Sequence, residues 1–132
     1  KKKEFLNFNK IRNMELHEAV TALAALAQSS RLAIFRILVQ AGPAGLPAGR
    51  IAELAGIAPS SLSFHLKELS HAGLAGSRQA GRFVIYTARY EAMNGLLDFL
   101  TSNCCGGNPC TPVSKCTPKP TRTKNAARKE PA

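Results

Sequence analysis

Four cysteines gather near the C-terminal end of this 132-residue chain, at Cys104, Cys105, Cys110 and Cys116. The first two are adjacent, and adjacent cysteines rarely bridge each other because the resulting ring is strained. Exposed thiols that cluster in this way indicate a reducing compartment and a soft ligand, since thiolates prefer soft metals and metalloids. The sequence therefore predicts a sulfur site in a cytoplasmic protein.

Other interpretations of the cysteine cluster stay open. It contains no Cys-x-x-C pair, which argues against a thioredoxin-like role. A structural zinc site with four cysteines normally has two spaced pairs, whereas one pair here is adjacent. A thiol enzyme would need a base beside a cysteine, but residues 103–116 contain no histidine or acid, and Asp98 is the nearest acid before them. We therefore expect no catalytic residues, while a redox-active or incidental cluster remains possible.

The excess positive charge lies at the two ends of the chain. The net charge of +10 divides into +4 for residues 1–13, +1 for residues 14–103 and +5 for residues 104–132. Basic tails are usually solvated, so a DNA-binding function must be argued from the nearly neutral middle. No apolar run is long enough to span a bilayer, and the first residues do not resemble a secretory signal.

Composition divides the chain into four segments. Residues 1–13 are interpreted as an extension outside the folded domain, since Met14 follows them. Residues 14–103 should form the folded domain, and residues 104–116 the ligand-binding segment. Residues 117–132 are rich in Pro, Thr and Lys without apolar periodicity, which predicts a disordered basic tail.

Helical periodicity dominates the first part of the folded domain. A first amphipathic helix is predicted from Leu16, Val20, Leu23 and Ala27. A second helix, RLAIFRILVQA, should begin at an N-cap formed by Ser29-Ser30 and end at Gly42-Pro43. This second helix is apolar nearly all round, so it should be the buried centre.

The second part of the domain combines two more helices, a hairpin and a last helix. RIAELAG predicts a short helix after a loop, and Pro59 opens a longer one that ends at Gly73. LAGSRQAGRFVIYTA predicts a β-hairpin with its turn at residues 79–82, because its second half is β-branched and aromatic. YEAMNGLLDFLTSN predicts a last helix that runs directly into the cysteines. The expected fold class is mainly α with a small β-hairpin.

This order of elements, helix, turn, helix and hairpin, is that of a winged helix-turn-helix. In the helix after Pro59, Leu66 and Leu69 lie within about 40° of Leu62 at helical spacing, so these leucines should face the core. The opposite face would enter a major groove, where hydroxyls, a cation and an aromatic ring can contact bases or phosphates. The candidate DNA-binding residues on this helix are Ser60, Ser61, Ser63, Phe64 and Lys67.

Some residues of the reading helix and of the hairpin have alternative interpretations that do not involve DNA. Phe64 could instead pack on the wing or on a partner chain, and His65 is expected to be a half-buried structural residue. In the hairpin, Arg78, Gln79 and Arg82 are candidates for contact with a minor groove or its phosphates, since they flank a protruding turn directly after the reading helix. A solvated loop would have a similar composition.

The quoted segments together resemble the ArsR/SmtB family of metal-sensing repressors over roughly residues 15–105. The resemblance depends on Ser-x-His-Leu at residues 63–66 and on R-x-x-G-R-x-x-x-Y at residues 78–86. It implies a homodimer whose first and last helices form the interface. It also implies repression by binding to a pseudo-palindromic operator of double-stranded DNA. The repression would be relieved when a metal or metalloid binds.

The chain departs from the best-known family motifs. Arsenic, cadmium and lead sensors often carry E-L-C-V-C-D-L before the reading helix, whereas this chain has GRIAELAGI. The histidine and carboxylate site of zinc and nickel sensors lies on the last helix, and all three histidines here precede that helix. The sequence instead resembles arsenic repressors with a C-terminal Cys-Cys pair plus one more cysteine.

This resemblance implies As(III) or Sb(III) as the inducer, with no organic cofactor, controlling arsenic resistance genes. The expected ligands are Cys104, Cys105 and Cys110, with Cys116 as a possible fourth. Adjacent residues on a helix point about 100° apart, so the helix would have to unwind at the Cys-Cys pair for both thiolates to bind one atom. Gly106 and Gly107 would allow that turn.

Several other functions stay open for comparison. The ligand could be another soft ion, such as zinc, cadmium or lead, or methylarsenite, or the thiols could serve a redox regulator. A metallochaperone on an inherited DNA-binding fold and an architectural DNA binder without a ligand are the remaining alternatives.

Overall fold

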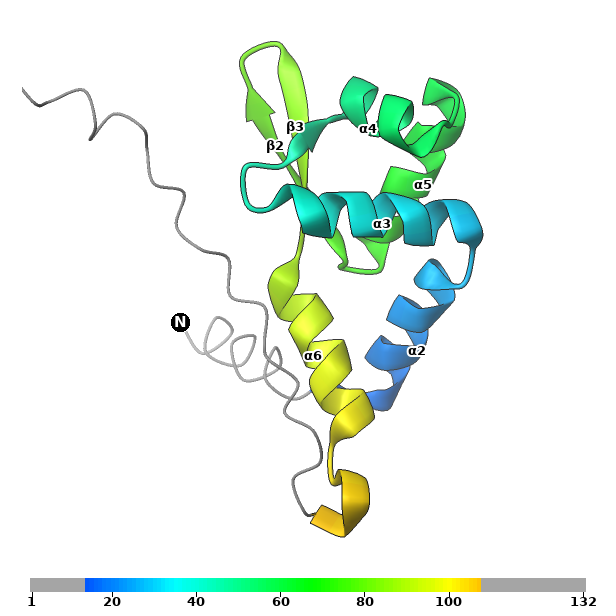
Figure 1. Cartoon of the computed structure of the whole chain (residues 1–132), viewed down its shortest axis with the longest axis vertical. Helices are drawn as coiled ribbons and strands as arrows, with labels where there is room; N and C mark the ends of the chain where they lie inside the picture. The colour runs from blue at the N-terminus through cyan, green and yellow to red at the C-terminus, as the bar shows by residue number, and fades with distance from the viewer. Residues whose placement is uncertain (1–13, 108–132) are drawn as a thin grey trace, which may run out of the picture.

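The computed structural model describes residues 14–107, which form five α-helices, a three-stranded sheet and a short 3₁₀ turn. The sheet hairpin projects at one end of the molecule, and the chain leaves the last helix at the opposite end (Figure 1). Residues 1–13 and 108–132 lie outside the described part, so the expected extension and basic tail cannot be compared with it. The architecture is the expected winged helix-turn-helix.

The first two helices, α2 (Leu16–Leu26) and α3 (Ser29–Ala41), meet at a sharp bend. α2 begins with a capping box in which Glu15 and Glu18 satisfy each other's backbone groups, the reciprocal arrangement that stabilises a first turn. The expected Ser-Ser cap of α3 is wrong. Gln28 is the N-cap, and its side chain accepts a hydrogen bond of 2.8 Å from the Arg31 amide.

The helix-turn-helix consists of α4 (Ala48–Ala55) and α5 (Pro59–His71). Gly56 ends α4 in the left-handed conformation, with φ of 65°, which glycine adopts without steric cost. Pro59 occupies the first turn of α5, where its missing amide hydrogen is not needed. The two predicted helices are therefore confirmed, with Pro59 opening the second as expected.

The wing is a hairpin of β2 (Ala75–Ala80) and β3 (Phe83–Ala88), with a two-residue turn between them. A short strand that the sequence did not predict, β1 (Leu46–Pro47), pairs with the other edge of β3, giving the order β1-β3-β2. Two residues with a proline carry too weak a pattern to be recognised as a strand. Through β1, the loop before the helix-turn-helix is attached to the wing.

α3 lies across the middle of the molecule, between the helix-turn-helix and the pair α2 and α6 (Figure 1). Its Ile34, Phe35 and Leu38 are buried, which confirms its predicted central position. A continuous apolar core joins it to every helix and to the base of the wing. The largest fully buried side chains are Ile34, Leu38, Ile51, Leu62, Leu69 and Leu74.

The last helix, α6 (Tyr90–Thr101), ends three residues before Cys104, with Ser102 in an extended conformation at its C-cap. The expectation that this helix runs directly into the cysteines is wrong. Asn103 and Cys105 have φ of 56° and 55°, in the left-handed region, and Cys104–Gly107 form a distorted 3₁₀ turn.

No helix within residues 14–107 can cross a membrane by itself, although α2 and α3 together, bent by 102°, have the length and composition of a broken span.

Candidate DNA-binding face and cysteine segment

The two faces of α5 differ as the leucine spacing predicted. Leu62, Leu66 and Leu69 are at most 2% exposed and pack in the core. The other face is exposed to solvent. The wing strands β2 and β3 follow α5 directly in the chain, which is the order that defines a winged helix. The exposed residues of this face are Ser60, Ser61, Ser63, Phe64, Lys67 and His71.

Phe64 is the most unusual residue of this outer face, because 56% of its side chain is exposed. Its ring contacts the edge of the neighbouring His65 ring, with centroids 5.7 Å apart. His65 is half-buried, as expected, and its Nδ1 atom is buried without a hydrogen-bond partner. Phe64 therefore keeps a large apolar surface available for a partner molecule, whether DNA or protein.

The hydroxyl of Ser63 donates a hydrogen bond of 3.1 Å to the carbonyl oxygen of Pro59. This bond lies within the first turns of α5, so the hydroxyl oxygen retains its capacity as an acceptor. Lys67 lies one turn further along the same exposed face. The face therefore combines small hydroxyl groups, one aromatic ring and one cation, all of which can contact a DNA groove.

The three candidate residues of the wing have different environments. Arg82 lies in the two-residue turn beside Gly81, whose φ is 61°, and its side chain is exposed. Gln79 donates from Nε2 to the Gly81 carbonyl oxygen at 3.2 Å, which bridges the end of β2 to the turn. Arg78 instead turns its guanidinium toward the loop after α3. Its NH2 nitrogen donates to the Ala44 carbonyl oxygen at 2.9 Å.

The cysteine segment lies at the other end of the molecule from the wing (Figure 1). Cys104 carries a free, half-buried thiol, whereas Cys105 is exposed and takes part in a disulfide bond. Within residues 14–107, no group of three or more His, Cys, Asp or Glu side chains is arranged to hold a metal ion. Cys110 and Cys116 lie outside the described residues, so the predicted set of three thiolates stays a prediction.

An apolar face remains exposed along the two helices that flank the cysteine end. Leu16 and Val20 of α2 are 69% and 56% exposed, and Leu97 and Leu100 of α6 are 38% and 56% exposed. The buried side of α2 is formed by Ala19 and Ala22 instead, so the leucine and valine stripe that marked the helix as amphipathic points outward. An apolar surface of this kind on a small protein marks an interaction site.

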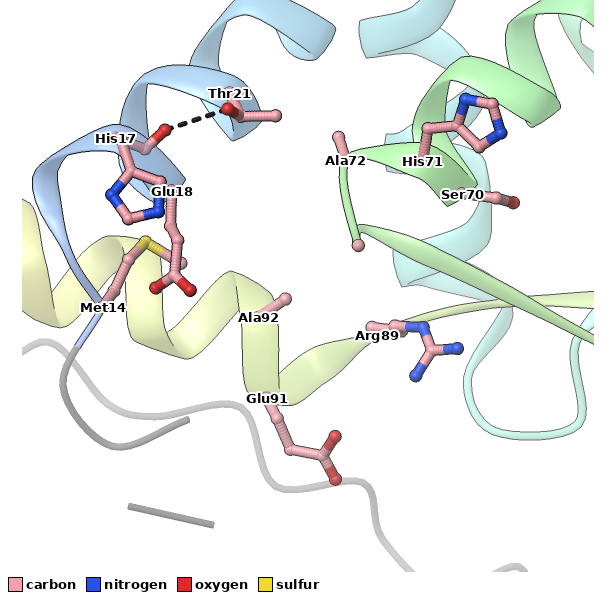
Figure 2. Close-up of a pocket in the computed structure, with 11 residues that line it drawn as sticks. Met14, His17, Glu18, Thr21, Ser70, His71, Ala72, Arg89, Glu91 and Ala92 are labelled. Atoms are coloured by element: carbon pink, nitrogen blue, oxygen red, sulfur yellow. Dashed lines mark hydrogen bonds between the residues drawn. The ribbon is translucent and has the colours of Figure 1, made fainter. Parts of the chain in front are cut away.

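A cleft that the sequence did not reveal lies between α2, the end of α5 and the start of α6 (Figure 2). Its volume is about 610 Å³, and it opens to solvent. His17 and Glu18 of α2 line one side, and His71 of α5 and Arg89 line the other. Because these walls come from segments far apart in the sequence and carry mixed charge, no local pattern could have indicated the cleft.

Comparison with known proteins supports this description. A family model described as a helix-turn-helix domain matches residues 26–75. The HTH-type transcriptional regulator YgaV of Escherichia coli (strain K12) is 28% identical over 88 residues, which cover 67% of this chain and 87% of YgaV. An ArsR-like transcriptional regulator from Rhodococcus sp. RHA1 has a TM-score of 0.57 and 27% identity, covering 64% of this chain and 76% of that one.

The structure of HlyU from Vibrio cholerae N16961 gives the decisive match. It is 33% identical to this chain, with a TM-score of 0.53, and the alignment covers 66% of this chain and 97% of HlyU. The chain belongs to the ArsR-like family of winged helix-turn-helix regulators. In this ArsR-like chain, α5 is the helix that corresponds to the reading helix and the β2–β3 hairpin is the wing. The resemblance inferred from the sequence is confirmed at this level.

Proposed function

We propose that this ArsR-like chain is a transcriptional repressor that binds double-stranded operator DNA. The observation that carries the proposal is the exposed face of α5, which presents Ser60, Ser61, Ser63, Phe64 and Lys67 while its leucines are buried. The placement of Arg82 at the tip of the adjacent hairpin adds a cation for a neighbouring groove or phosphate. The relatives are named as transcriptional regulators, and we assign no catalytic role to any residue.

The DNA-binding form is proposed to be a cytoplasmic homodimer. The exposed leucine and valine stripe on α2 and α6 supports this, because covering it with a second copy would remove a large apolar area from water. A two-fold dimer carries two reading helices, so the operator should be pseudo-palindromic, with half-sites about 34 Å apart. The same dimer would place the two cysteine segments at the end of the interface helices.

The inducer is proposed to be As(III) or Sb(III), bound by Cys104, Cys105 and Cys110, and the regulated genes to be those of arsenic resistance. Soft trivalent metalloids bind thiolates, and the free thiol of Cys104 fits that requirement. Cys105 fits only when it is reduced, because a disulfide sulfur is not a thiolate ligand. Cys116 is a possible fourth ligand.

The release mechanism differs from the one expected from the sequence. α6 already ends at Thr101, so the ligand does not need to unwind the helix before both cysteines can approach one atom. Instead, a ligand would fix the segment after α6 and change how Leu97 and Leu100 pack in the dimer. A hundredfold loss of operator affinity requires about 2.7 kcal/mol of coupling between the two sites.

A Cys105→Ser variant tests this proposal. It should bind operator DNA as tightly as the parent protein in a gel shift, yet stay bound when arsenite is added under reducing conditions. Cys116→Ser is the matched control, and it should still release DNA. Normal release by Cys105→Ser would show that Cys105 is not a ligand. Sulfur coordination of bound As(III), measured by X-ray absorption for the parent and for Cys110→Ser, would test the three-thiolate set directly.

A thiol-based redox regulator is a second candidate, favoured by the disulfide at Cys105. In that case oxidation alone, without arsenite, should change operator affinity. The comparison of oxidised and reduced parent protein in the same gel shift separates the two functions. If oxidation changes affinity by less than about twofold while arsenite releases the DNA, the metalloid sensor is the better description.

A further inference from the structure

The guanidinium of Arg78 is hydrogen-bonded to the protein's own backbone, although the residue is exposed and lies on the wing. Its two terminal nitrogens donate to the carbonyl oxygens of Ala44, at 2.9 Å, and Pro43, at 3.5 Å. Arg78 belongs to β2, whereas these carbonyls precede β1 on the far side of β3. The side chain therefore crosses the central strand and joins the outer strand of the wing to the loop after α3.

We propose that Arg78 is a positioning residue that fixes the direction of the wing, and that Arg82 makes the direct phosphate contact. The proposal rests on the DNA-binding function proposed above and goes further, because it gives different roles to two arginines of the same hairpin. The sequence alone made both arginines candidates for DNA contact, with a solvated loop as the alternative. The structure separates them by what each guanidinium can reach.

A cation is favourable near the loop that Arg78 contacts. It follows the C-terminus of α3, where the helix dipole and unpaired carbonyl groups place partial negative charge. The last turn of α3, which ends at Ala41, carries no basic residue of its own. Arg78 supplies that charge from the wing. Its planar fork can bond two consecutive carbonyls at once, which a lysine ammonium on a flexible stem does poorly.

The same loop is fixed to β3 from its other side. Gly45 has φ of 70°, and a Cβ atom there would collide with the carbonyl oxygen of Tyr86 and with side chains of β3. One residue later, Leu46 pairs with Tyr86 in the β1–β3 ladder. Arg78 therefore fastens β2 to a loop that is already attached to β3.

Such a connection stabilises the outer part of the wing, because beyond the short pairing with β1 the wing has only two strands, and a two-stranded hairpin is marginally stable by itself. The tip residues 79–84 are all exposed, so the core does not fix their direction. Without the Arg78 bonds, the hairpin would keep its strand pairing but sample a wider range of orientations relative to α5. Arg82 would then reach the DNA backbone for a smaller fraction of the time, and affinity would fall.

Salt dependence of DNA binding distinguishes the two roles. The affinity of the parent protein, Arg82→Ala, Arg78→Ala and Arg78→Lys should be measured from 50 to 300 mM salt, a range of roughly sixfold, on a duplex selected from a random pool. The affinity falls as salt rises, so this slope of log affinity against log salt is negative. Arg82→Ala should reduce the steepness of the slope by about 1, the value for one lost phosphate contact. Arg78→Ala should weaken binding roughly tenfold with a smaller change in slope, and Arg78→Lys should restore little of it.

The opposite pattern would overturn the proposal. If Arg78 contacts phosphate, Arg78→Ala should reduce the steepness of the slope by about 1 and Arg78→Lys should restore both slope and affinity, since lysine binds phosphate well. If the parent protein binds no duplex at all, the proposed function fails. The positioning role of Arg78 is then tested by amide exchange, which needs no DNA. Amide exchange at residues 44–46 should be roughly tenfold faster in Arg78→Ala and unchanged in Arg82→Ala, and equal exchange in both variants would refute the positioning role.

Discussion

The two ends of this molecule are organised by different forces. At the wing end, α4 and α5 are held by side chains such as Ile51, Leu62 and Leu69, which are at most 2% exposed, and Ala75 and Ala88 anchor the base of the hairpin in the same core. At the cysteine end, the chain leaves α6 through Ser102 and Asn103, and its direction is set by local backbone angles rather than by a buried core. The first end is defined by packing and the second by turns.

This difference suits the two proposed tasks. A DNA groove must be met by a rigid surface, because a contact misplaced by an ångström is lost, and a buried core gives that rigidity. A soft ligand must draw thiolates together, and left-handed residues beside glycines allow this without breaking a helix. Substitutions at the wing end should therefore change the free energy of unfolding far more than substitutions at the cysteine end.

Leu69→Ala should have the largest effect, because Leu69 of α5 is fully buried in the core. Removing three buried carbon atoms and leaving a cavity should lower the free energy of unfolding by about 3 kcal/mol. Phe64→Ala is the matched control on the outer face of the same helix and should cost less than about 0.5 kcal/mol. Urea unfolding measures both. Equal losses would mean that the outer face also packs in the folded protein.

Most of the wing end could be predicted from the sequence because its signals are local and repeated. The leucine spacing in α5 gave the buried face correctly, and Pro59 gave its first turn. The strand β1 was missed because two residues carry no periodicity, and its pairing with β3 depends on the fold of the whole domain. The N-cap of α3 was assigned to serines, although the longer Gln28 side chain reaches the Arg31 amide from one position earlier.

The candidate site was predictable in composition but not in geometry. Sequence spacing placed Arg78 and Arg82 together at a turn, yet the side chain of Arg78 bonds a loop 34 residues away in the chain. The end of α6 was also misplaced, because Thr101 and Ser102 do not contain a strong stop signal and instead bond back to the helix. Their hydroxyls donate to the carbonyl oxygens of Leu97 and Phe99.

Gly45→Ala should have the second largest effect and tests whether the loop behind the wing belongs to the packed end. A Cβ atom in this left-handed position would collide with the backbone of Tyr86, so we expect a loss of about 2 kcal/mol in the free energy of unfolding. Gly81→Ala is the matched control, with a similar φ but open space around it, and should cost about 1 kcal/mol. Thermal unfolding measures both, and similar losses would mean that the loop can move away from β3.

Asn103→Ala should have the smallest effect and tests the other end. Asn103 has φ of 56°, which alanine adopts at a cost of roughly 1 kcal/mol, while asparagine tolerates it better. If the segment after α6 orders independently of the core, that cost appears as a local change in conformation, and global unfolding shifts by less than about 0.5 kcal/mol. Arsenite affinity should fall a few-fold, because the approach of the two cysteines is no longer prepared in advance. A loss of 1 kcal/mol or more in global unfolding, with arsenite affinity unchanged, would show that the cysteine end unfolds together with the core and is not a separate turn-based element.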